Sequence, residues 1–194
     1  MSFQIIRAAI TDRPTIRNML IVVAVCLFAG TAIGTEHKFS DHYFTKIDPA
    51  AKLKLGEQTF NEVTAFFDTA EKAIETKDLQ ALMALYSDNY TDGEHDKQSA
   101  EQIWKRMFSR FDGMATHHNM KLVNVSADKN MVIISCSGLL LGVPDPDKRH
   151  HVTIDNWTLQ DHILIKEGGI WKLIGTYGKD RKRLWFDKPM HPLF

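Results

Sequence analysis

The sequence predicts an α+β domain in which three helices pack on a strongly curved antiparallel sheet, behind an N-terminal signal segment. Three observations support this fold class. Apolar residues recur at helical spacing between residues 49 and 113, and at the two-residue spacing of strands between 116 and 178. Helices that precede a run of hairpin-connected strands are typical of α+β folds. In two strands the apolar parity switches part-way, which requires a β-bulge and bends the sheet.

The first helix is predicted from residue 49 to about Thr76. Asp48 is an N-cap and Pro49 fits the first helical position, because proline has no N–H to leave unsatisfied there. Apolar residues then recur with helical spacing through the segment. Gly56 is expected to break or bend the first turns.

Two further helices follow. Asp78 caps a short second helix that we expect to run through Tyr86. Ser99 and Gln102 have the spacing of a capping box, so we expect Ser99 to cap the third helix. Gly113 is expected to close that helix.

Four strands are predicted after the helices, at residues 116–126, 131–143, 150–166 and 170–178. Turn residues separate them, including Gly168 and Gly169. In the first strand the apolar parity changes between Leu122 and Val123, and in the third it changes between Ile154 and Trp157. A curved sheet closed by helices encloses a concavity, which is where ligand pockets form.

The N-terminal segment has the features of a secretory signal peptide. Basic residues precede an uncharged apolar run at 19–33, and small residues follow it. The run is shorter than the roughly 20 residues that span a membrane comfortably. We expect cleavage near Ala32 or Gly34 and a periplasmic or secreted protein; the alternative is an uncleaved membrane anchor.

Composition excludes some partners and some chemistry. Lys+Arg and Asp+Glu number 24 each, so no charge excess favours nucleic acid. Of the 2 cysteines, Cys26 lies in the signal segment, which leaves Cys136 without an internal disulfide partner. Cys136 lies in an apolar stretch and is predicted to be a small buried core residue.

The C-terminal tail, residues 179–194, begins with basic residues and becomes aromatic and proline-rich. It is predicted either to contact an anionic membrane surface or a protein partner, or to cover the edge of its own domain. The chain is thus expected to divide into four parts. These are a signal peptide or anchor (1–34), an arm leading into the first helix (35–56), the folded domain (57–178) and this tail.

Residues 57–178 resemble the nuclear transport factor 2-like superfamily, especially its SnoaL-like and ketosteroid-isomerase-like bacterial branches. The resemblance lies in "KDLQALMALYSDNYTDGEHDKQSAEQIWKRM" and "WTLQDHILIKEGGIWKLIGTYG". It implies a cone-shaped fold with a pocket between helices and sheet, a small apolar molecule in that pocket, and a homodimer. Members include isomerases, dehydratases and proteins without known chemistry, so the fold alone does not fix the function.

The candidate catalytic residues are Tyr90, Asp92 and His118. The resemblance places Tyr86, Tyr90 and Asp92 at the pocket, where a tyrosine hydroxyl can hydrogen-bond an oxyanion and an aspartate can act as a base. The alternative is that residues 88–93 form a polar turn. His118 shares parity with Met120 and is expected to face inward, whereas His117 is expected to be solvated.

No metal site and no cofactor is predicted. The stretch "HHVTIDNWTLQDH", residues 150–162, has several histidines and aspartates, but His151, Asp155 and Asp161 span too great a length to hold one ion. Convergence of His118 with Asp155, Asp161 or His162 from a neighbouring strand remains open.

Several other residues are candidate ligand contacts. Asp155 and Asn156 are expected to line one wall of the pocket beside Trp157. Trp171 and Tyr177 are read as core or pocket wall, and Trp104 either closes the pocket or packs in the helix core.

Three functions follow from these features. The first is an exported domain that binds a small ligand in a hydrophobic pocket, without established catalysis. The second is an acid–base enzyme of the isomerase or dehydratase type, and the third is an accessory subunit of a membrane-associated complex. Asp92 or Asp155 buried next to a tyrosine or histidine would favour the enzyme, whereas solvated carboxylates would exclude it.

Overall fold

The computed structural model describes residues 39, 45–93, 95–145 and 150–178. All of these residues belong to the second of the two compact units into which the chain divides, His37–Phe194. The predicted signal segment (1–34) and the basic tail (179–194) lie outside the described residues. None of the helices in the described part of the chain is long and apolar enough to cross a membrane.

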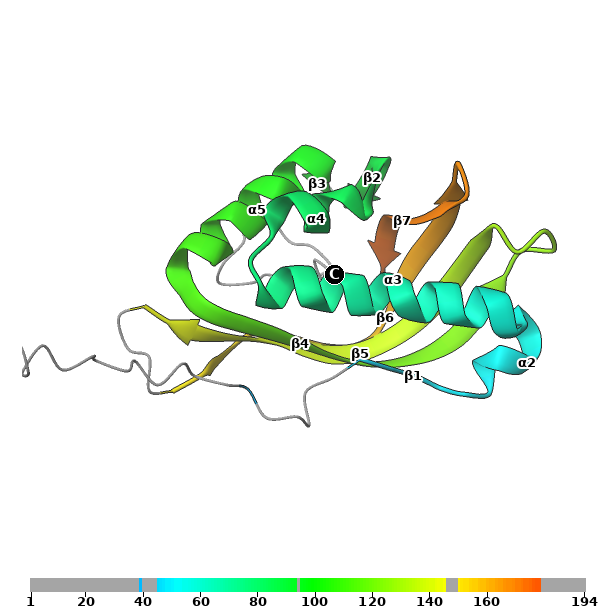
Figure 1. Cartoon of the computed structure of the whole chain (residues 1–194), viewed down its shortest axis with the longest axis horizontal. Coiled ribbons are helices and arrows are strands. Elements are labelled where there is room, and N and C mark those ends of the chain that lie inside the picture. The colour runs from blue at the N-terminus through cyan, green and yellow to red at the C-terminus, as the bar shows by residue number, and fades with distance from the viewer. Residues whose placement is uncertain (1–38, 40–44, 94, 146–149, 179–194) are drawn as a thin grey trace, which may run out of the picture. The chain divides into compact units, whose positions relative to one another are not determined.

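Four helices and seven strands make up the described domain (Figure 1). The helices are α2 (Ala51–Leu55), α3 (Glu57–Glu75), α4 (Leu79–Ala84) and α5 (Lys97–Arg110). The strands are β1 (Lys46–Ile47), β2 (Tyr86–Asp92), β3 (His95–Asp96), β4 (Phe111–Val125), β5 (Met131–Pro144), β6 (Val152–Glu167) and β7 (Ile170–Tyr177). The helices pack on one face of the curved sheet, with α3 lying along it (Figure 1).

The seven strands form one mixed sheet in the order β1-β4-β5-β6-β7-β2-β3. The four long strands β4 to β7 form the predicted antiparallel meander. The expectation of a wholly antiparallel sheet is wrong, because β1 pairs with β4 and β2 pairs with β7 in parallel. Parallel neighbours need a long crossover, and helices α2 to α5 supply it between β1 and β4.

Gly56 divides the predicted first helix in two. Its φ of 78° is a left-handed value that favours glycine, so α2 ends there and α3 starts anew. Asp78 caps the second helix as predicted, since its carboxylate accepts a hydrogen bond from the Ala81 N–H at 2.9 Å. That helix stops at Ala84, and Tyr86 begins β2 instead of continuing the helix.

The predicted cap of the third helix is wrong by one turn. Asp96 is the N-cap of α5, and its carboxylate accepts from the Ser99 N–H at 2.8 Å. The Ser99 hydroxyl in turn accepts from the Asp96 N–H at 2.9 Å. Ser99 is therefore the third helical residue of a capping box that starts earlier. The helix ends at Arg110 and the chain enters β4 directly at Phe111, before Gly113.

The predicted bulges are confirmed in both strands. The β4–β5 register shifts between Leu122 and Asn124, so Val123 is the extra residue. In β6 the register shifts between Thr153 and Asp155, so Ile154 is the extra residue at the start of the predicted switch. A second shift, which the apolar parity did not predict, lies between Trp157 and Gln160, where Leu159 has a φ of 51° and is 70% exposed. The Leu159 N–H donates to the Ser137 hydroxyl of β5 at 3.0 Å, which holds the bulge in place.

Glu62 of α3 ties the helix to the far end of the sheet. Its Oε2 accepts from Lys166 Nζ at 2.7 Å and from the Trp171 indole N–H at 2.9 Å. The Lys166 ammonium also lies 5.6 Å from the centre of the Trp171 ring. These contacts, with the Lys166 hydrogen bond contributing most, lower the pKa of the Glu62 carboxyl to about 2.

We expect Glu62→Gln to make folding less sensitive to acid. The lowered pKa stabilises the folded state above the unfolded-state pKa of 4.5, and this stabilisation is lost as the pH falls from there towards 2. Urea unfolding at a series of pH values measures the effect. The difference in unfolding free energy between wild type and variant should be largest near neutral pH and should shrink in acid. Parallel curves would contradict the role of Glu62.

Candidate functional site

The helix-facing side of the sheet carries two groups of buried polar side chains. The first, here called the tyrosine–aspartate group, consists of Tyr86, Tyr90 and Asp92 of β2. The second, here called the histidine–cysteine group, consists of His118 of β4, Cys136 of β5 and His162 of β6. All six residues are at most 2% exposed.

The tyrosine–aspartate group is held by the inward positions of β2. The Tyr86 and Tyr90 rings meet edge to face, with centroids 4.8 Å apart. Trp104 of α5 donates its indole N–H to the Tyr86 hydroxyl oxygen at 2.9 Å, so the helix and the strand are joined inside the core. Segment 86–92 is thus a strand and not the polar turn that was the alternative.

Burial raises the pKa of the Tyr86 hydroxyl above its ordinary value, and the charge of Asp92 adds to this effect. Burial likewise raises the pKa of Tyr90 well above its ordinary value, with further contributions from Tyr86 and Asp92. Both hydroxyls therefore stay protonated across the physiological range. Because the Tyr86 oxygen accepts from Trp104, its own proton can be donated to another group.

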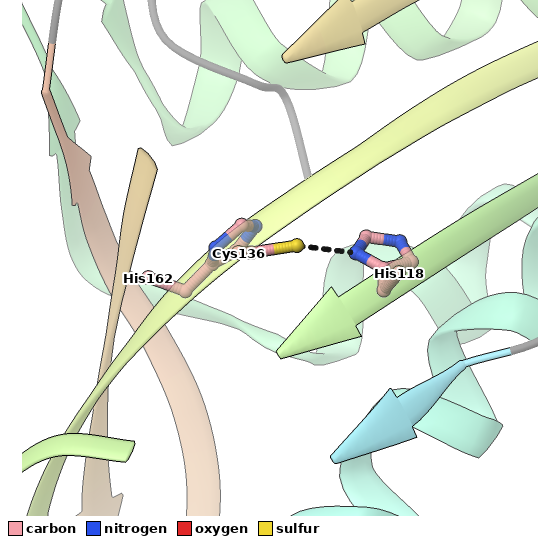
Figure 2. A group of neighbouring side chains, drawn as sticks. All are labelled: His118, Cys136 and His162. Carbon is pink, nitrogen blue, oxygen red and sulfur yellow. Dashed lines mark hydrogen bonds between the residues drawn. The ribbon is translucent and has the colours of Figure 1, made fainter. Parts of the chain in front are cut away.

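The histidine–cysteine group comes from three adjacent strands. Cys136 faces Met120 on β4 and Gln160 on β6, while His118 faces Gly138 and His162 faces Ile134. The two histidines are therefore diagonal neighbours of Cys136 on opposite sides of β5. Figure 2 shows the Cys136 sulfur directed at the His118 ring, and its Sγ lies 3.4 Å from His118 Nδ1. One ring nitrogen of His162 completes a set of three donor atoms that all lie within 4.8 Å of one another.

Aromatic side chains surround this group. The Trp157 indole N–H donates to Cys136 Sγ at 3.2 Å. Phe67 of α3 covers the histidines, with ring centroids 6.0 Å from His118 and 5.9 Å from His162. Gly138 provides the space for the indole, since a Cβ there would lie 2.6 Å from the Trp157 ring.

Burial determines the protonation of the group. It lowers the pKa of His118 well below its ordinary value, with smaller contributions from His162 and His117, so His118 is a neutral imidazole. Burial raises the pKa of the Cys136 thiol to about 12, which keeps the sulfur protonated at neutral pH. Two imidazoles and one thiol are donors for a transition metal and unsuited to calcium or magnesium.

The other residues predicted at the site fall into two sets. Trp104, Asp155, Trp157 and Trp171 are buried, and Trp104 packs in the helix core against Phe108. Asn156 is exposed and Tyr177 is 68% exposed, so neither lines the interior. His117 is half-buried, whereas it was expected to be solvated.

Two surface depressions are open to solvent. One, of about 420 Å³, lies over α3 and α4 and includes Asp68, Lys72 and Asp78. The other, of about 470 Å³, lies over β2, β6 and β7 and includes Thr91, Ile174 and Tyr177. Neither is lined by the tyrosine–aspartate or the histidine–cysteine group, whose side chains pack among the core residues.

The histidine–cysteine group was not predicted as a unit. His118 was expected to face inward and its convergence with His162 was left open, but Cys136 was expected to be a core residue. The apolar parity of β5 contained one usable signal, because Ile134, Cys136 and Gly138 share a face. Which residues lie opposite them depends on the register between strands, and the bulge in β6 shifts that register.

Comparison with known proteins gives the fold. No family model matches the sequence, and no curated protein matches it. Among solved structures, a candidate scytalone dehydratase from Novosphingobium aromaticivorans is 11% identical with a TM-score of 0.54, covering 64% of this chain and 85% of that one. A candidate dehydratase of the NTF2-like family from Streptomyces avermitilis is 12% identical with a TM-score of 0.48, covering 62% and 94%.

Bd1075 of Bdellovibrio bacteriovorus is 15% identical with a TM-score of 0.49, and the match covers 60% of this chain and 40% of that one. The chain thus spans less than half of that longer protein. The chain has the nuclear transport factor 2-like fold, and the resemblance noted in the sequence is confirmed at that level.

Proposed function

We propose that the domain is exported and binds a small apolar molecule on the helix-facing side of its sheet, beside the tyrosine–aspartate group. The observation that carries the proposal is the burial of Asp92, which is 1% exposed and lies close enough to Tyr86 and Tyr90 for its charge to raise their pKa values. Taking a carboxylate out of water costs free energy, and such groups concentrate at functional sites.

Apolar surroundings and convergent polar groups match the composition of small-molecule sites. The tyrosine hydroxyls can donate hydrogen bonds to a ligand oxygen, while Trp104 and the sheet provide apolar contact. Because these side chains pack against one another, a ligand has to move them apart as it enters. The apolar run at residues 19–33 supports the export part of the proposal. The homodimer and a partner for the C-terminal tail stay predictions.

An acid–base enzyme is the second candidate, and the burial of Asp92 and Asp155 favours it over a solvated site. In that function Asp92 removes a proton from a carbon next to a carbonyl group, and Tyr90 donates a hydrogen bond to the enolate oxygen. The similarity of the fold to a candidate scytalone dehydratase supports this class. His118 belongs to the histidine–cysteine group and is a second candidate proton acceptor, since it is neutral.

Binding and exchange of 2-tetralone, a bicyclic ketone with acidic α-protons, test both functions together. We expect saturable binding by calorimetry, weakened roughly ten-fold by Tyr90→Phe through the lost hydrogen bond. For the enzyme, NMR should show α-proton exchange into D2O that Asp92→Asn slows by roughly 100-fold or more. Tyr177→Phe is the matched control, because Tyr177 is exposed on the other face.

The proposed site would be contradicted if the wild type does not bind 2-tetralone. It would also be contradicted if Tyr90→Phe and Tyr177→Phe weaken binding equally. Binding without exchange would support the ligand-binding function and exclude the enzyme for this ketone class. Thermal unfolding of each variant establishes that the domain is folded in the assay.

A further inference from the structure

The histidine–cysteine group is built like a metal site and lies outside the tyrosine–aspartate group at which the ligand is proposed to bind. Its donor atoms come from the middle of three hydrogen-bonded strands, so the backbone positions are fixed by the sheet. His118 is 2% exposed and Cys136 and His162 are fully buried. Core positions of this kind are ordinarily apolar, and three convergent nitrogen and sulfur donors there require an explanation.

The geometry is close to that of three-coordinate ligation. Bonds of about 2.0–2.3 Å to nitrogen and sulfur, arranged as a triangle, place the donor atoms about 3.5–3.8 Å apart. The separation of Cys136 Sγ from His118 Nδ1 is 3.4 Å, and no pair in the group exceeds 4.8 Å. If the longest separation is close to this 4.8 Å limit, a shift of the His162 ring nitrogen by about an ångström brings it to the distance that the triangle requires.

The surroundings favour a soft monovalent ion. The group contains one thiol and no carboxylate, so one thiolate neutralises Cu(I) but leaves a net positive charge on Zn(II). An uncompensated charge in a buried position is costly. Met120 lies directly opposite Cys136 and is fully buried, which places a thioether on the same face. Histidine, cysteine and methionine together are ligands that suit copper.

The residues around the group have the roles expected of supporting contacts. Trp157 donates to the Cys136 sulfur and so stabilises negative charge on it. Phe67 packs over both imidazoles from α3 and keeps water away.

We propose that His118, Cys136 and His162 bind one Cu(I) ion in the core of the sheet. On binding, the S–H bond of Cys136 breaks, its proton leaves to solvent, and the sulfur forms a bond to copper. Each imidazole contributes a nitrogen lone pair. No electron is transferred, because copper enters and remains as Cu(I).

Anaerobic titration with Cu(I) held by bicinchoninate tests the proposal on the full chain. The protein carries Cys26→Ser, so that Cys136 is its only thiol, and is stripped of metal and reduced beforehand. We expect one copper per chain. Loss of a supporting contact lowers metal affinity by roughly 10–100-fold, and Trp157→Phe should lower the affinity for Cu(I) by an amount in that range. Cys136→Ala removes a ligand and should lower the affinity for Cu(I) by more. His118→Asn removes a proposed ligand and should also lower the affinity for Cu(I). His117→Asn is its matched control and should bind as the parent does.

X-ray absorption of the copper-loaded parent protein is a second measurement that does not depend on the folding of a variant. It should show two nitrogen neighbours and a thiolate sulfur. Copper retained unchanged by Cys136→Ala, a copper shell without sulfur, or no uptake by the parent would each overturn the proposal. Tighter uptake of Zn(II) than of Cu(I), measured with 4-(2-pyridylazo)resorcinol, would overturn the assignment to copper.

Discussion

Gly138→Ala is expected to destabilise the domain by about 3 kcal/mol or more, at the upper end of the cost of overpacking a core. A Cβ at this position would lie 2.3 Å from the His117 carbonyl oxygen and 2.6 Å from the Trp157 ring. The first contact is with backbone in the middle of the sheet, which cannot move without breaking the β4–β5 pairing. The second displaces the indole that donates to Cys136.

Urea unfolding measures this cost, with Gly113→Ala as the matched control. Gly113 lies in β4 and pairs with Val143 of β5. A Cβ at Gly113 would lie 3.5 and 3.8 Å from its nearest atoms, which are ordinary van der Waals contacts. The control should unfold near the wild-type midpoint. Equal midpoints for the two variants would show that the sheet accommodates a side chain at Gly138.

Trp104→Ala is expected to cost about 3–5 kcal/mol, the range for truncating a large buried aromatic residue. Trp104 is 1% exposed, stacks near Phe108 and donates to the Tyr86 hydroxyl. Trp104→Phe keeps most of the apolar contact but removes the indole N–H, so it should cost about 1–3 kcal/mol. The difference between the two variants separates packing from hydrogen bonding.

Unfolding free energies of both variants are compared with Lys105→Ala, an exposed neighbour on α5 that should change stability by no more than about 0.5 kcal/mol. The near-ultraviolet circular dichroism of Tyr86 and Tyr90 should also change in Trp104→Phe. If that variant is as stable as the wild type, the hydrogen bond to Tyr86 contributes nothing to folding.

Local patterns predicted much of the fold. The alternation of apolar residues in β4 to β7 located all four long strands, and the parity switches located the bulges at Val123 and Ile154 but not the second bulge of β6 at Leu159. Asp78 was identified as a cap because a capping side chain acts on backbone groups only three residues away. Alternation, parity switches and helix caps can be recognised in the sequence because the interactions that cause them involve residues only a few positions apart.

Features that depend on distant segments were not predicted. Tyr86 continues a helical pattern, but the Leu173 N–H of β7 donates to the Leu85 carbonyl and draws the chain into the sheet. Asp96 and Ser99 are both residue types that can cap a helix. The helix starts at the earlier of the two, Asp96, which also pairs with Thr91 in the sheet. The histidine–cysteine group depends on two inter-strand registers, which no pattern within one strand contains.

The bulge at Leu159 has a consequence for what the loss of one residue from β6 would do. Trp157 and His162 are five residues apart, and in a regular strand an odd separation directs two side chains to opposite faces. Both are nevertheless buried on the helix-facing side, because the bulge adds one residue between them. Loss of the single codon for that extra residue would therefore direct the indole and the imidazole to opposite faces of the sheet, and only one of the two could still reach the cysteine.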